Sequence, residues 1–124
     1  MENKTEKILY ITTVGDENPD KAAFPFVLAN AALSMDIEAT IVLQSGAVVF
    51  AKKGFADTVP AGGGLPPIKK LLADYIELGG KIIVCGPCIK HRDIAESDLI
   101  DGAEVTAAAQ VNIAALEADA VLVY

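Results

Sequence analysis

Short apolar runs rich in β-branched residues recur five times along this chain of 124 residues, and they limit the possible folds more than any other feature. Segments with helical features separate most of the runs, and no run is followed by an obvious hairpin turn. Strands that alternate with helices form a parallel sheet with helices packed on both of its faces. A chain of this length is expected to form one domain. We therefore predict a single α/β domain over residues 1–124, built on a five-stranded, mainly parallel sheet.

Local signals give the expected positions of the elements. The five strands are expected at residues 8–13, 37–43, 82–84, 103–105 and 120–124. Asn18 and Pro19 form a helix start, and this helix is expected to reach about Met35. Pro25 lies inside it and predicts a kink or a later start.

The later helices have weaker boundaries. Residues 47–53 fit a strand or two helical turns, and we favour the helix because Gly54 follows two lysines. A helix over 68–78 follows Pro66 and Pro67, and Thr106 is expected to cap a helix from 107 to about 117. The glycine run at 62–64 lacks the Lys-Ser/Thr ending of a phosphate loop, so it predicts a connector or a lid.

Composition narrows the class of function. The net charge of −7 argues against a general binder of nucleic acid or anionic membranes. No apolar run approaches the roughly 18 residues needed to span a bilayer. The charged residues Glu2, Lys4, Glu6 and Lys7 precede only a short apolar run, so we expect no signal peptide and a cytoplasmic protein. In a reducing compartment, a Cys-x-x-Cys motif indicates redox, sulfur-transfer or metal chemistry.

The candidate site is the stretch 81–92, which holds both cysteines and the only histidine of the chain. Cys85 is expected at the carboxyl end of a strand, where parallel sheets bind their ligands. Backbone N–H groups and nearby cations at such a position favour the thiolate. The alternative is that both cysteines are small apolar packing residues.

Several kinds of chemistry fit two neighbouring cysteines. Cys85 and Cys88 can form a local disulfide across the Gly-Pro turn, as in a thiol–disulfide reductase or a peroxide-responsive protein. With His91 they provide at most three metal ligands, whereas structural zinc takes four, so a metal site would have to be shared between subunits. We expect no metal, and we also expect no cofactor. A non-catalytic scaffold or ligand-binding subunit would need neither cysteine.

The wider pattern around the cysteines resembles a known family. The tetrapeptide Cys85–Cys88 has the spelling of the thioredoxin active site, but Val84 stands where thioredoxins usually have Trp, and no proline follows Pro87. A strand-end cysteine, an arginine seven residues on, an acidic segment over 96–105, an Ala-rich helix and a closing apolar strand are together similar to the DsrE/DsrF-like family of sulfur-relay proteins.

This resemblance implies a flavodoxin-like, three-layer α/β/α sandwich that assembles as a homotrimer or hexamer. It also implies a cysteine that carries sulfur as a persulfide or thiosulfonate between donor and acceptor proteins, a sulfurtransferase-like activity. By its spacing to Arg92, Cys85 matches the sulfur-carrying cysteine, and Cys88 is an addition found in some branches. The usual Arg-Gly is Arg92-Asp93 here. Family members without the cysteine serve as structural subunits.

The resemblance and the local chemistry together suggest a role for each residue of the motif. The Cys85 thiolate is expected to attack the sulfane sulfur of a donor. Lys90 or Arg92 would stabilise the resulting anion, and Cys88 would resolve or shield the persulfide. His91 would tune the thiol.

Overall fold

The computed structural model describes residues 5–124 and contains one five-stranded sheet. The order across the sheet is β4-β3-β2-β1-β5, and every neighbouring pair is parallel. The strands are β1 (Lys7–Thr12), β2 (Glu38–Leu43), β3 (Lys81–Cys85), β4 (Ala103–Thr106) and β5 (Ala120–Val123). The predicted parallel sheet is therefore confirmed. The expectation that the chain has no signal peptide depends partly on Glu2 and Lys4. These two residues lie outside the described part of the chain.

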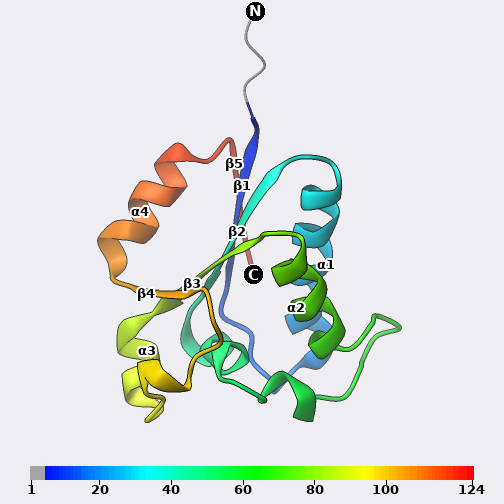
Figure 1. Cartoon of the computed structure of the whole chain (residues 1–124), viewed down its shortest axis with the longest axis vertical. Helices are drawn as coiled ribbons and strands as arrows, with labels where there is room; N and C mark the ends of the chain where they lie inside the picture. Colours follow the sequence, from blue (N-terminus) through cyan, green and yellow to red (C-terminus); the bar gives the residue numbers. More distant parts are fainter. Residues whose placement is uncertain (1–4) are drawn as a thin grey trace, which may run out of the picture.

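Helices cover both faces of this sheet (Figure 1). The α-helices are α1 (Pro19–Ser34), α2 (Ile68–Glu77), α3 (Gly86–His91) and α4 (Ala108–Glu117). Short 3-10 helices lie in the connections: η1 (Ser45–Ala51) and η2 (Ala56–Thr58) between β2 and α2, and η3 (Glu96–Asp98) between α3 and β4. Helices α1 and α2 pack against each other on one side, and α3 and α4 lie on the other side. The predicted three-layer α/β/α sandwich is confirmed.

The order of the strands determines which loops meet. The first four strands follow one another across the sheet, and α4 then carries the chain back to the opposite edge, where β5 pairs with β1. The carboxyl ends of β2, β3 and β4 are consequently neighbours. The cysteine-bearing strand β3 has one of these strands on each side.

The main core lies between the sheet and the α1/α2 layer. Its aromatic centre is Phe26, whose ring meets those of Phe50 and Tyr75 edge to face at centroid distances of 6.3 Å. All three side chains are buried. The opposite layer is much less covered, because every residue of β5 is exposed and every residue of α4 is exposed or half-buried.

Helix α1 begins where the sequence predicts. The Asn18 side chain accepts a hydrogen bond of 3.1 Å from the Lys21 backbone N–H, which satisfies one of the free donors of the first turn. The helix runs through Pro25, which is buried, so the expectation of a later start is wrong.

Two other boundary predictions need correction. Residues 45–51 form a 3-10 helix, which agrees with the helical interpretation, but it ends at Ala51 because Lys52 is extended and bridges Leu99. Thr106 does not cap α4. Ala107 occupies the N-cap position, and its backbone N–H donates to the Gln110 side-chain oxygen at 3.2 Å.

The glycine-rich segment runs along the start of α1. A Cβ at Gly62 would lie 3.4 Å from the Asp20 backbone nitrogen, so the two segments are in contact. The Leu65 N–H donates to the Gly62 carbonyl at 3.1 Å and closes a turn there. This packing fits the connector of the sequence prediction.

No helix within residues 5–124 is long and apolar enough to cross a bilayer.

Candidate functional site

The two cysteines meet at the carboxyl end of β3. Cys85 is the last residue of the strand, and it forms a disulfide with Cys88 in the first turn of α3. Their Cα atoms are 5.3 Å apart, and both side chains are half-buried. The prediction of a strand-end cysteine is confirmed, and Gly86 and Pro87 make the turn that brings the sulfur atoms together.

The loop after β2 contributes a hydrogen-bond donor to this pair. The Ser45 backbone N–H donates to the Cys88 sulfur at 3.3 Å. Ser45 has a φ of +51°, a left-handed conformation that is uncommon for residues other than glycine. The two residues are 43 positions apart in sequence. This donor was not predicted from the sequence, because no local pattern indicates a contact between residues so far apart.

Arg92 reaches the backbone of the motif. Its guanidinium Nη1 donates to the Cys88 carbonyl at 3.1 Å, so it holds the first turn of α3 to the end of the same helix. Lys90 and His91 lie on the exposed surface of α3. Of the three predicted cationic residues, Arg92 is thus the one that the structure brings into contact with the cysteine pair.

The conformation of Asp93, in the turn after α3, explains why this position does not need the glycine that is usual in the family that the sequence resembles. Asp93 has a φ of +56°, in the left-handed region that glycine favours and aspartate tolerates. The Ile94 N–H then donates to the Ile89 carbonyl at 3.0 Å, as expected for a helix that ends in a left-handed residue. The turn is therefore kept without glycine.

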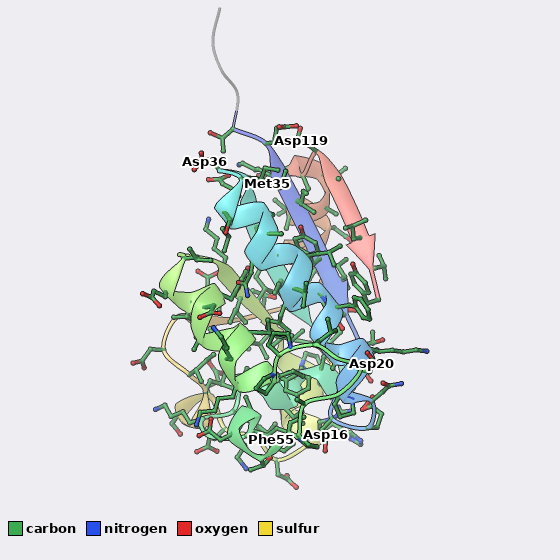
Figure 2. The ribbon with its side chains drawn as sticks, turned by 90° about the vertical axis from the view of Figure 1, so that its right-hand side faces the viewer. Asp16, Asp20, Met35, Asp36, Phe55 and Asp119 are labelled. Atoms are coloured by element: carbon green, nitrogen blue, oxygen red, sulfur yellow. A yellow bond between two sulfur atoms is a disulfide. The ribbon has the colours of Figure 1, made fainter. Side chains whose placement is uncertain are left out.

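The disulfide lies at the carboxyl end of the sheet, opposite to a cavity at the amino end. A cavity of about 240 Å³ lies beside the amino ends of the strands, and its charged lining includes Lys7, Lys81 and Glu104. In Figure 2, the labels Met35, Asp36 and Asp119 mark the amino end of the sheet, and the labels Asp16 and Phe55 mark the carboxyl end. Because neither cysteine lines the cavity, a reaction partner would meet the disulfide at the surface of the carboxyl end.

Among residues 5–124, no group of three or more His, Cys, Asp or Glu side chains is arranged to hold a metal ion.

Comparison with known proteins gives one family. The model of the DsrE/DsrF-like family matches residues 6–124. Two relatives come from Methanocaldococcus jannaschii. The uncharacterized protein MJ0760 is 35% identical over 107 residues, which are 85% of this chain and 38% of that protein. The uncharacterized protein MJ0989 is 36% identical over 80% of this chain and 82% of its own length.

The chain therefore spans well under half of MJ0760 but most of MJ0989. Another relative, the uncharacterized protein MK0008 of Methanopyrus kandleri, is 36% identical over 81% of both chains.

Solved structures agree on the fold. The YchN protein of E. coli superposes with a TM-score of 0.80 at 22% identity, covering 97% of this chain and all of that one. The protein MTH1491 of Methanobacterium thermoautotrophicum gives a TM-score of 0.68 at 11% identity, covering 98% of this chain and all of its own. These likenesses show the fold alone.

Proposed function

The chain belongs to the DsrE/DsrF-like family, and from this premise we propose that it is a sulfur carrier that accepts sulfane sulfur on Cys85 and passes it to a partner protein. One observation supports the proposal most strongly. The only two cysteines of the chain meet at a half-buried position at the carboxyl end of β3. A sulfur atom that must pass between proteins needs such an accessible position rather than an enclosed cavity.

The reaction begins with the cysteines reduced. A thiol reductant supplies two electrons and two protons to open the disulfide. The Cys85 thiolate then attacks the outer sulfur of a donor persulfide. A new S–S bond to Cys85 forms, the S–S bond of the donor breaks, and the donor leaves as a thiolate. With thiosulfate as donor, the leaving group is sulfite and Cys85 again becomes a persulfide.

Cys88 has a defined part in this scheme. When no acceptor protein takes the sulfur, attack of the Cys88 thiolate on the inner sulfur of the Cys85 persulfide restores the disulfide and releases hydrosulfide. The Ser45 N–H, 3.3 Å from the Cys88 sulfur, would stabilise negative charge there. Arg92 would keep Cys88 in position through its carbonyl, and the exposed Lys90 and His91 would attract an anionic donor.

We also propose that the protein works as a homotrimer or hexamer. Large apolar side chains are exposed on α4 and β5, where a soluble monomer would normally be polar. They are Ile113, Leu116, Val121, Leu122 and Val123, and Leu116 is 87% exposed. Burial of this α4/β5 surface against further copies would complete the thinly covered layer of the sandwich.

Intact-mass measurement tests the carrier function. The reduced protein is exposed to a low-molecular-weight persulfide or to thiosulfate, beside the Cys85→Ser and Cys88→Ser variants. We expect a gain of one sulfur atom in Cys88→Ser, where no second cysteine resolves the persulfide, and no gain in Cys85→Ser. A gain that depends only on Cys88, or no gain in any protein, would contradict the proposal.

A thiol–disulfide redox function is the second candidate, and the Cys85–Cys88 disulfide itself favours it. A redox function needs both cysteines to form the disulfide. The only mass change is then the loss of two hydrogens when the reduced protein is oxidised. Either single variant would then abolish the reaction, whereas a sulfur carrier keeps its activity in Cys88→Ser.

A further inference from the structure

A buried hydroxyl beside the cysteine pair is unused in the disulfide form. Within the described part of the chain, the Thr106 Oγ1 atom is buried and has no hydrogen-bond partner. A buried hydroxyl without a partner is costly, and native proteins seldom keep one without a reason. It does not serve α4 either, because Ala107 is the N-cap of that helix and no side chain caps it.

The register of the sheet brings Thr106 next to Cys85. Cys85 on β3 pairs with Thr106 on β4. Paired residues of neighbouring strands are about 4.8 Å apart, and their side chains project from the same face of the sheet. The two chain segments also stay close one residue after Cys85, because a Cβ at Gly86 would lie 3.4 Å from the Thr106 carbonyl oxygen.

The chemistry of Cys85 changes when the disulfide opens. In the disulfide, the Cys85 sulfur is bonded to Cys88 and carries no charge. As a thiolate or a persulfide anion, the same side chain is free to rotate, and its negative charge requires a donor. A threonine hydroxyl supplies one O–H donor, which is the group that Thr106 has available.

We infer that Thr106 is a hydrogen-bond donor to the reacting sulfur, and that its hydroxyl binds the Cys85 anion once the disulfide has opened. The inference rests on the proposed function for its role in sulfur transfer. The hydrogen bond from the Thr106 hydroxyl to the reduced Cys85 can be tested separately from sulfur transfer. On this view, the cysteine pair has a separate donor for each sulfur: the Ser45 N–H for Cys88 and the Thr106 hydroxyl for Cys85.

The test uses the Cys88→Ser protein, in which Cys85 is the only thiol. Thr106→Val removes the hydroxyl at nearly constant shape, and Thr106→Ser keeps it as the matched control. The rate of alkylation of Cys85 by iodoacetamide is measured against pH. We expect the midpoint of the rate profile to rise by about one pH unit in Thr106→Val, equivalent to about tenfold slower alkylation below the midpoint, and to stay in place in Thr106→Ser.

A second readout separates this role from a structural one. In the protein with both cysteines oxidised, Thr106→Val is expected to melt at the same or a higher temperature, because an unpartnered hydroxyl is removed. A lower melting temperature, or an unchanged alkylation midpoint, would overturn the inference.

The two proposals fail in different ways. If Thr106→Val shifts the midpoint but no protein takes up sulfur from a persulfide donor, Thr106 binds the thiolate and the carrier function is wrong. If sulfur is taken up and the midpoint does not move, the carrier function stands and the role of Thr106 is wrong.

Discussion

The Tyr75 hydroxyl joins the neighbouring strands β2 and β3 at their amino ends, and its removal should destabilise the protein at neutral pH but not at alkaline pH. Tyr75 lies on α2 and is fully buried. Its hydroxyl lies 3.0 Å from the Ala39 carbonyl and 2.5 Å from the Lys81 carbonyl. Tyr75→Phe removes this link and leaves the ring in place.

At neutral pH, the variant should be less stable. A hydrogen bond inside a protein contributes about 1 kcal/mol to the free energy of unfolding. We therefore expect Tyr75→Phe to unfold more easily by about 1 kcal/mol near pH 8.

At alkaline pH, the difference should disappear. Burial raises the pKa of Tyr75 above its ordinary value of 10.0, so the folded state keeps its proton when the unfolded state has lost it. The stability linked to this group is complete below pH 10 and falls as the pH rises further. At pH 11 the loss is about 1.4 kcal/mol, and the variant escapes it because a phenylalanine ring has no proton to lose.

Urea unfolding at intervals from pH 8 to pH 11 measures both effects. The stability curves of the natural protein and of Tyr75→Phe should converge and meet close to pH 11. Absorbance at about 295 nm reports tyrosinate directly, and the folded protein should show no ionisation of Tyr75 near pH 10. Stability curves that stay parallel, or ionisation of Tyr75 in the folded protein at its ordinary pKa of 10.0, would refute the reasoning.

Two further substitutions test the surface and the packing. Leu116→Glu should change the free energy of unfolding of the monomer by no more than about 0.5 kcal/mol, since Leu116 is 87% exposed, but it should reduce the oligomer mass measured by light scattering. Met35→Glu, at a 67% exposed position after α1, is the control, and an unchanged mass for Leu116→Glu would count against the α4/β5 interface. Gly80→Ala should cost about 1–3 kcal/mol, because a Cβ at this position would overlap the Tyr75 ring. The same substitution in Tyr75→Ala should cost clearly less in urea unfolding, and equal costs in the two backgrounds would show that the ring is not the obstacle.

The elements could be predicted from sequence because their signals are local. The Asn18-Pro19 helix start and the strand that ends at Cys85 each depend on a few neighbouring residues, and both are confirmed. The errors fall where tertiary contacts override a local signal. Lys52 leaves the helical path to bridge Leu99, and Pro25 stays inside α1 in a buried position.

The cysteine motif was likewise visible in the sequence, because Cys85 and Cys88 are three residues apart and share one turn. The rest of the site depends on strand order, which no local pattern contains. Ser45 approaches Cys88 from 43 positions away because β2 lies beside β3. Thr106 pairs with Cys85 because β4 lies on the other side. Sequence by itself thus indicated the cysteine pair and the alternation of strands and helices, whereas the tertiary structure decided which residues lie beside each cysteine, since only the parallel pairing of distant strands brings their ends together.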